Sequence, residues 1–381
     1  MTQVHRSRGV DSVHAQLASD AAGDPVPATR DQICGTRCAT ATLGDRLAAV
    51  GDHRRARRSP VERRWCLDDV WVTTRDGVRL AARDCGSRYA SHTVVFLHGL
   101  CLSQASWAPQ IDHLLRRYGG AVRVISYDHR GHGRSGQAPM SSYRIEQLAD
   151  DLAQVLTARS VSGPLTLVGH SMGGMAALCY LARPAADRPV EPHGLVLAAS
   201  TAGKLSERGL GRLLASPATG MLFGLIDHTP AQALRALARP LCATLHRCRV
   251  GGNAKRATLA AVTAAALAST PVPTAVGFLP SLRSYHQYHT LGSIRANTIV
   301  VSGGADLLTP PSHSRDLAAS IPRAAHVHLP TAGHMLPQET PHIINTAIRR
   351  AMKPSGPARV ASPGVTRSRA ATLSVCEDRR V

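Results

Sequence analysis

Continuous apolar runs recur along the middle of the chain and alternate with longer amphipathic stretches. Runs such as "HTVVFLHG" at 92–99 are typical of strands that are buried on both faces of a sheet. Helical periodicity is clear in "WAPQIDHLLRRY" (107–118) and "IEQLADDLAQVLTA" (145–158). The further strand-like runs are "VRVISYD" (122–128), "LTLVGHS" (165–171), "GLVLAAS" (194–200), "NTIVVSGG" (297–304) and "AAHVHLPTAGH" (324–334). Strands that alternate with helices in this way predict an α/β fold with a doubly wound, mostly parallel sheet.

An antiparallel hairpin is predicted to precede this series. In "WCLDDVWVTTRDGVRLAARDCG" (65–86), two alternating stretches flank Asp76 and Gly77. Because Asp-Gly suits two residues with positive φ, we expect a type I′ turn between the two strands.

One long insertion interrupts the alternation of strands and helices. Between Ser200 and Ser293 no convincing strand occurs, but helical patterns do: "RGLGRLLA", "AQALRALA", "KRATLAAVTAAALA" and "SLRSYHQYH". We therefore predict a domain over 65–352 whose helical cap, at about 203–290, covers the ends of the strands. The segments 1–64 and 353–381 carry no sustained period, and we expect a disordered basic arm and a disordered tail.

The charge of the chain is strongly positive, at a formal +20 from 45 basic and 25 acidic residues. Lys204, Lys255 and Lys353 are the only lysines, so arginine supplies almost all of the positive charge. No zinc-finger spacing, basic heptad helix or aromatic-basic RNA-binding pattern accompanies it. The balance favours a solvated arginine-rich surface without a specific nucleic-acid partner, and weak association of Arg-rich segments with anionic membranes stays open.

The cysteines and the apolar segments predict a soluble, cytoplasmic protein. Nine cysteines are scattered without metal-binding spacing, so we expect mostly reduced thiols and no metal site. The first residues lack the apolar core of a signal peptide, and the longest mildly apolar run, "ATLAAVTAAALAST" (257–270), is too short for a membrane span.

Candidate chemistry enters with "GHSMG", residues 169–173, which places one serine between small residues where a strand gives way to a helix. A sharp strand-to-helix turn needs small neighbours so that the backbone can pass, and it exposes the Ser171 hydroxyl. The N–H groups at the start of the following helix then face any negative charge that develops there. This context makes Ser171 a candidate nucleophile.

A serine nucleophile needs a base, and the base needs a group that orients it. His334 follows the last apolar run, and Asp306 follows the run before it. Both would lie with Ser171 at the carboxyl ends of the strands, where sites occur in open α/β sheets. Asp128 also follows a strand, but we expect it to shape its own loop.

Four motifs together resemble the α/β-hydrolase fold family over residues 65 to 352: "FLHGL" (96–100), "YDHRGHGRS" (127–135), "GHSMGG" (169–174) and "GGADLLTP…AGH" (303–334). The resemblance is to its esterase, monoglyceride-lipase and cofactor-free haloperoxidase branch with a helical cap. It implies Ser171 as nucleophile, His334 as base and Asp306 as the orienting acid. It also implies an oxyanion hole from the backbone N–H groups of Leu100 and Met172, and no cofactor. His98, Gly99, Gly169, His170 and Gly173 are expected to support the site.

Serine at the nucleophile position argues against epoxide hydrolases and haloalkane dehalogenases, which carry aspartate there, and against dienelactone hydrolases, which carry cysteine. The sequence thus predicts hydrolysis of a small or lipid-like carboxylic ester through an acyl-enzyme. Monoacylglycerol, thioester or carbon–carbon cleavage, and perhydrolysis, remain alternatives with the same three residues. A non-catalytic binding protein of the same fold is a further alternative.

Overall fold

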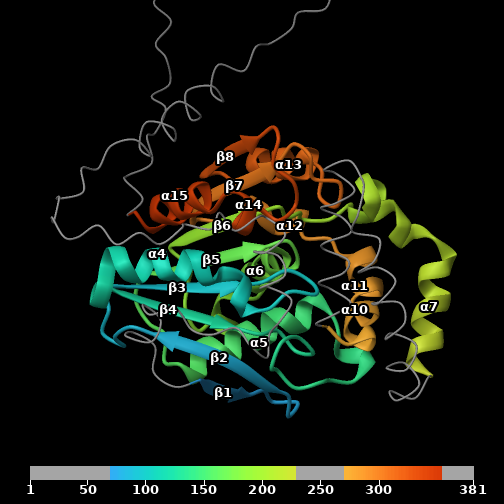
Figure 1. Ribbon diagram of the computed structural model, residues 1–381, viewed down its shortest axis with the longest axis horizontal. Coiled ribbons are helices and arrows are strands. Elements are labelled where there is room, and N and C mark those ends of the chain that lie inside the picture. The colour runs from blue at the N-terminus through green and yellow to red at the C-terminus, as the bar shows by residue number, and fades with distance from the viewer. Residues whose placement is uncertain (1–68, 229–269, 354–381) are drawn as a thin grey trace, which may run out of the picture.

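A computed structural model describes residues 69–228 and 270–353, which form an eight-stranded sheet flanked by helices (Figure 1). The strand order is β1-β2-β4-β3-β5-β6-β7-β8. Strand β2 is antiparallel to both of its neighbours, and all other pairs are parallel. The strands are β1 (Val70–Thr73), β2 (Arg79–Cys85), β3 (His92–Leu97), β4 (Val122–Tyr127), β5 (Leu165–His170), β6 (Gly194–Ala198), β7 (Asn297–Gly303) and β8 (Ala324–Leu329). The predicted fold class is confirmed.

Each of the six strand-like runs of the predicted series contains a strand. All residues of β4, β5 and β6 are buried, which explains why these strands read as continuous apolar stretches without alternation. The edge strand β8 is mostly half-buried instead, and it accommodates His326 and His328, which both contact the Ser302 hydroxyl.

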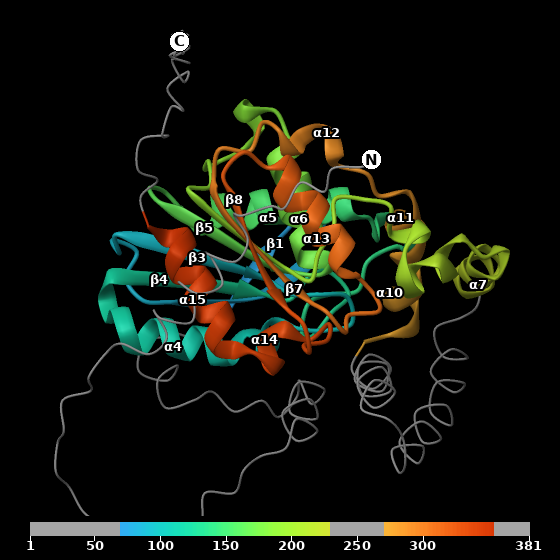
Figure 2. The same ribbon diagram turned by 90° about the horizontal axis from the view of Figure 1, so that it is seen from above.

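Helices cover both faces of the sheet (Figure 2). One apolar layer joins the sheet to α4 (Ala108–Tyr118) and α15 (Pro341–Met352), and the other joins it to α5 (Ile145–Ala158), α6 (Met172–Ala182) and α13 (Pro311–Ser320). The remaining helices on this body are short: α14 (Leu336–Glu339) and 3₁₀ turns at Gln104–Trp107, Gly119–Ala121, Met140–Ser142 and Ala185–Asp187. The predicted helices at 107–118 and 145–158 are both present.

At β3 the chain changes the side of the sheet to which it adds its next strands. From β3 the chain passes to β4 on one side, and β5 then pairs with β3 on the other side. The loops that follow β3 and β5 therefore lie beside each other at the carboxyl edge of the sheet, which is where open α/β folds place their sites.

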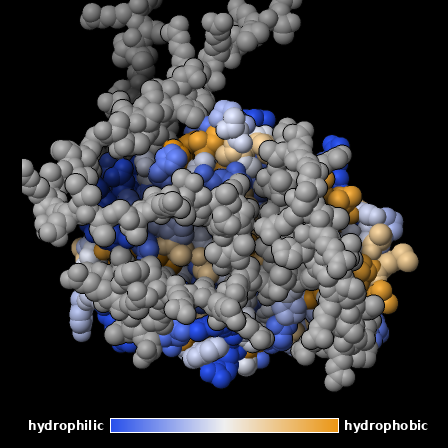
Figure 3. Space-filling model, in the orientation of Figure 1, coloured by the Kyte–Doolittle hydropathy of each residue, from blue (hydrophilic) through white to orange (hydrophobic). Residues whose placement is uncertain are grey.

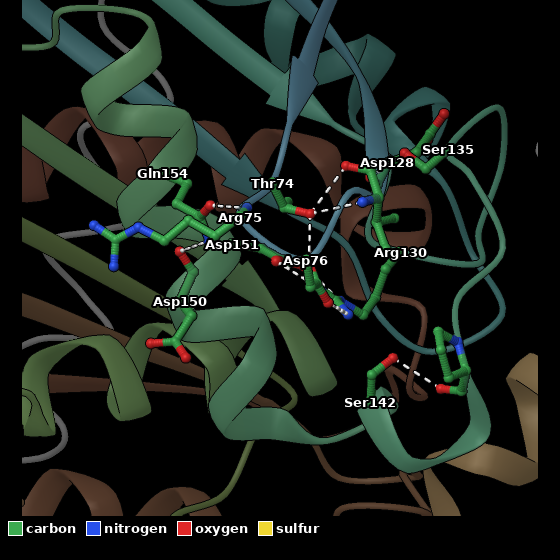
Figure 4. Close-up of polar contacts among 12 residues, drawn as sticks. Thr74, Arg75, Asp76, Asp128, Arg130, Ser135, Ser142, Asp150, Asp151 and Gln154 are labelled. Atoms are coloured by element: carbon green, nitrogen blue, oxygen red, sulfur yellow. Dashed lines mark hydrogen bonds and ion pairs between the residues drawn. The ribbon is translucent and has the colours of Figure 1, made fainter.

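The predicted hairpin is present, but its turn is not type I′. Gly77 donates to the Thr74 carbonyl at 2.9 Å, and Gly77 alone in this turn has positive φ, at 84°. A type I′ turn needs positive φ at both central residues. Asp76 does not have positive φ, and its side chain accepts hydrogen bonds from Thr74 and from Arg130 (Figure 4).

Arg130 joins three elements from a fully buried position. It makes two hydrogen bonds to Asp151 of α5, at 2.7 and 2.8 Å, and two to Asp76 of the hairpin turn, at 2.8 and 3.2 Å (Figure 4). The hydrogen bond from Arg130 lowers the pKa of Asp76 to about 2. The loop after β4 is thereby fixed to the hairpin and to α5.

Between β6 and β7 the described residues are helical. They form 3₁₀ helices at Leu205–Glu207 and Gly209–Ala215, then α7 (Pro217–Asp227), α10 (Val272–Gly277), α11 (Leu279–Ser284) and α12 (Tyr288–Leu291). The predicted helix over "SLRSYHQYH" is instead divided, because residues between α11 and α12 turn to let His286 bridge to Gly203. The predictions for 1–64, for the patterns at 231–238 and 255–268, and for the tail after Lys353 lie outside the described residues.

Helix α7 exposes apolar side chains. Met221 is 76% and Leu225 is 66% exposed, and Leu213 just before the helix is 68% exposed. Orange surface gathers where α7 lies in Figure 3. Within the described ranges no single helix is long and apolar enough to cross a membrane. The bent pair Gly209–Ala215 and Pro217–Asp227 reaches the required length and apolar composition only when its two helices are counted together.

Three cysteines fall in the described ranges. Cys101 and Cys179 are free and buried, as expected, whereas Cys85 is disulfide-bonded. Two of these three cysteines agree with the expectation of mostly reduced thiols, and Cys85 is the exception among them. Pattern reading could not reveal this, since a disulfide depends on which residues the fold brings together.

Two fully buried histidines make stability depend on pH. Burial lowers the pKa of His170 to about 3 and holds the pKa of His129 well below its ordinary 6.5. Below pH 6.5 the unfolded chain binds protons that these folded side chains do not, so the free energy of unfolding falls as pH falls. Each such histidine contributes a slope of about 1.4 kcal/mol per pH unit.

We expect the unfolding free energy, measured by denaturant titration at pH 7.5, 6.0 and 5.0, to decrease across this series. His129→Phe keeps an aromatic ring but removes the titrating nitrogens. It should reduce the slope of the unfolding free energy against pH by about 1.4 kcal/mol per pH unit. An unchanged slope in this variant would show that His129 does not remain neutral in the folded protein.

Candidate active site

Ser171 lies on a strained turn between β5 and α6. Its φ of 51° and ψ of −118° fall outside the conformations that side-chain-bearing residues favour. Its N–H donates to the Ala198 carbonyl of the neighbouring strand at 2.9 Å, which fixes the turn to the sheet. Strain of this kind persists only where the surroundings determine it, and it occurs mostly at functional sites.

The flanking glycines are required by close backbone contacts. A Cβ atom on Gly173 would lie 2.2 Å from the Leu97 carbonyl oxygen, and one on Gly169 would lie 2.5 Å from the backbone of Gly174. The predicted supporting role of both glycines thus has a steric basis: α6 begins directly against the end of β3.

His334 and Asp306 are hydrogen-bonded to each other. His334 Nδ1 lies 2.8 Å from Asp306 Oδ2, and both side chains are buried. Asp306 also accepts from the N–H groups of Leu308 and Thr309 and from the Thr309 hydroxyl, at 2.7 to 2.9 Å. Burial alone would raise the pKa of Asp306, but His334 and the Thr309 bonds outweigh it and leave the pKa below its ordinary value. Asp306 therefore stays ionised, and its position requires that His334 Nδ1 carry a proton.

His170 supports the loop that carries His334. Its Nε2 lies 2.9 Å from the His334 carbonyl oxygen, which can only accept, so this nitrogen donates. Burial lowers the pKa of His170 to about 3, which keeps its ring uncharged across the neutral range.

Two backbone N–H groups meet beside Ser171. Met172 is the first residue of α6, and Leu100 follows the end of β3; neither N–H has an acceptor among the described residues. The Gly99 carbonyl, on the same peptide unit as the Leu100 N–H, accepts from His98 Nδ1 at 2.8 Å. These are the positions expected for an oxyanion hole, with His98 and Gly99 in supporting places.

A cavity of about 440 Å³ brings these groups together. Leu100, Ser171, Met172 and His334 all line it. Part of the remaining described wall comes from the segment between β6 and β7. This wall is mainly aliphatic and consists of Leu102, Met175, Leu205, Leu210, Leu213, Leu214, Ala275, Val276, Leu279, Leu282, Leu308 and Met335. The described lining contains no Asp, Glu, Lys or Arg side chain.

Asp128 takes the role expected of it. Its carboxylate accepts from the N–H groups of Gln104 and Arg134, at 2.8 and 2.9 Å, so it organises the loops after β3 and β4. Sequence analysis did not identify Thr309 or Cys101 as residues of the site, although both line the cavity. The Asp306-x-x-Thr309 spacing is a local signal for Thr309, whereas only the position next to Leu100 indicates that Cys101 belongs to the site.

The chain matches proteins of known family. A sequence model described as the alpha/beta hydrolase fold matches residues 92–341, more than half of the chain. The chain belongs to the α/β-hydrolase fold family. Among the described residues no group of His, Cys, Asp and Glu could hold a metal ion.

Some of the relatives are named as hydrolases or esterases. A Variovorax paradoxus protein, RutD, named for carbamate hydrolysis, is 30% identical over 71% of this chain and 94% of its own length. The bifunctional esterase/perhydrolase of Acinetobacter calcoaceticus is 39% identical, but the match spans only 30% of this chain and 39% of that enzyme. A solved esterase of Thermogutta terrifontis is similar with a TM-score of 0.55, at 25% identity over 74% of this chain and 97% of its own.

The steric requirement at Gly173 gives a direct test. Gly173→Ala should lower the free energy of unfolding by at least about 2 kcal/mol, because its Cβ would overlap the Leu97 carbonyl. Gly220→Ala is the matched control: it lies in α7 with nothing within 4 Å of the added Cβ, and helix propensity favours it by about 1 kcal/mol. Thermal unfolding of the two variants checks this, and equal stability would contradict the close contact.

Proposed function

We propose that this protein is a serine hydrolase that cleaves carboxylic esters through an acyl-enzyme on Ser171. The observation that carries the proposal is the 2.8 Å bond between His334 and Asp306 at a cavity that Ser171 also lines. The strained turn, the N–H groups of Leu100 and Met172, which have no acceptor within the described ranges, and the esterase names among the relatives support it.

The reaction follows from the proton held at His334 Nδ1. Asp306 keeps that proton in place, so Nε2 is free to take the proton of the Ser171 hydroxyl as the oxygen attacks the ester carbonyl carbon. The carbonyl oxygen becomes an oxyanion, which accepts hydrogen bonds from Leu100 and Met172; each such donor is typically worth about 3 kcal/mol in the transition state. His334 then protonates the leaving alcohol, and water, activated in the same way, releases the acid and restores the Ser171 hydroxyl.

The cavity wall points to an uncharged aliphatic acyl group. Its described lining offers methyl and methylene groups and no cation that could pair with a second carboxylate. At ~30 Å³ for each water-sized group, the 440 Å³ volume holds on the order of 15 non-hydrogen atoms as an upper limit. A medium-length acyl chain would fill this space.

Turnover of p-nitrophenyl esters tests the proposal. The wild type should release p-nitrophenol, Ser171→Ala should fall to background, and Asp306→Asn should lose about 10⁴ in kcat because the wrong tautomer of His334 forms. Leu225→Ala, on the exposed side of α7, is the control that should keep normal turnover. Turnover that persists in Ser171→Ala would refute the acyl-enzyme. If the protein acted on carbamates or in perhydrolysis but not on esters, the proposed substrate class would be wrong.

The cavity also predicts discrimination against charge. We expect kcat/KM for a p-nitrophenyl ester of a straight-chain monoacid to exceed that for a half-ester of a diacid of equal length by at least roughly 100-fold, because burying an unpaired carboxylate is costly. Leu102→Arg would place a cation at the described wall and should narrow this ratio. Equal rates on both esters in the wild type would contradict an uncharged acyl site.

A further inference from the structure

The oxyanion donor Leu100 lies in a tight turn with an unusual third residue. Leu102 N–H donates to the Gly99 carbonyl at 3.1 Å, which closes a β-turn over Gly99–Leu102. Cys101, the third residue, has φ of 61°, whereas Leu100 is not among the residues with positive φ. These φ values fit a type II turn, whose third position favours glycine. Cys101 therefore adopts a conformation that residues with a side chain rarely take.

His132 holds that conformation from outside the turn. The Cys101 N–H donates to His132 Nε2 at 3.1 Å. The other ring nitrogen, Nδ1, lies 3.0 Å from the Arg130 carbonyl, which can only accept. The proton must therefore sit on Nδ1, and Nε2 is left with the lone pair that the Cys101 N–H needs. The bond pairs two groups that are both buried.

The support for His132 is itself rigid. Arg130 is fixed by its hydrogen bonds to Asp76 and Asp151 (Figure 4), and the ring of His132 packs against His98 and Phe278, with centroids 5.1 and 5.8 Å away. The acceptor nitrogen is thus held in place before any substrate binds.

Two histidines hold the two peptide units around Leu100. His98 bonds to the Gly99 carbonyl of the first unit, and His132 bonds to the Cys101 N–H of the second. Without the second bond, Cys101 can relax toward the negative φ that residues with a side chain prefer, and the Leu100–Cys101 peptide moves with it. The Leu100 N–H lies on the adjoining peptide and would be held less rigidly, and donors in an oxyanion hole act through being preorganised.

We propose that His132 is a positioning residue for the Leu100 oxyanion donor, and that it acts by holding Cys101 in the left-handed conformation. The inference rests on the proposed ester hydrolysis. It assigns His132 no contact with substrate, and it separates this histidine from its neighbour His129, whose ring nitrogens make no hydrogen bond.

His132→Phe tests the role of the ring nitrogen. Phenylalanine fits the aromatic surroundings but cannot accept the Cys101 N–H. We expect kcat for a p-nitrophenyl ester to fall by roughly 10- to 100-fold with KM within about twofold, the pattern of a loss in the transition state alone. His132→Gln offers Oε1 as an acceptor and should recover part of the loss. His129→Phe makes the same change at an equally buried histidine of the same cluster and should leave kcat unchanged.

The turn conformation is tested by a second substitution. In the His132→Phe background, Cys101→Gly should restore kcat by roughly tenfold or more, because glycine takes positive φ without help. Cys101→Ala removes the same thiol but keeps the steric penalty, so it should not rescue. Unfolding midpoints establish that each variant is folded, and His132→Leu replaces His132→Phe if the latter does not fold.

The outcomes separate this inference from the function on which it rests. A wild type without Ser171-dependent turnover overturns the proposed function and this inference together. A wild type that turns over while folded His132→Phe does so equally overturns the positioning role alone. Equal rescue by Cys101→Gly and Cys101→Ala, or an equal loss in His129→Phe, would also overturn it, because the effect would then arise from packing.

Discussion

The site depends on one contact between two backbones. At Gly173 the first turn of α6 lies against the carbonyl groups of Leu97 and His98, so closely that no Cβ fits between them. This approach places the helix N-terminus beside the loop after β3. It therefore puts the N–H groups of Met172 and Leu100, which are distant in sequence, on one wall beside Ser171. A sheet in which β3 and β5 were not neighbours could not build this arrangement.

Around that contact the chain uses neutral, buried histidines as geometric parts. His98 and His132 bond to successive peptide units of the loop after β3, and His170 bonds to the peptide of His334. Imidazole suits this purpose because its two nitrogens, set in a rigid ring, can join a carbonyl on one side to an N–H on the other. The polar atoms of the site are thus fixed without introducing charge next to the apolar cavity.

Much of this could be predicted from the sequence, because the relevant signals are local. Strands buried on both faces read as unbroken apolar runs, and the glycines around Ser171 follow from one sharp turn. Other features depend on partners far along the chain. Arg130 shapes the turn at Thr74–Gly77, and His132 holds the conformation of Cys101. The Cys85 disulfide likewise depends on which residues the fold brings together. A pattern within a short window contains no information about such contacts.

The position of Leu213 connects the cavity to the outside. This side chain lines the cavity and is also 68% exposed, next to the apolar side of α7. Among the described residues, the aliphatic wall therefore continues to the molecular surface at Leu213. The acyl chain of the proposed ester substrate can shed its hydration shell a few methylene groups at a time along such a wall. Entry and product exit are then divided into small steps, and neither requires one large desolvation barrier.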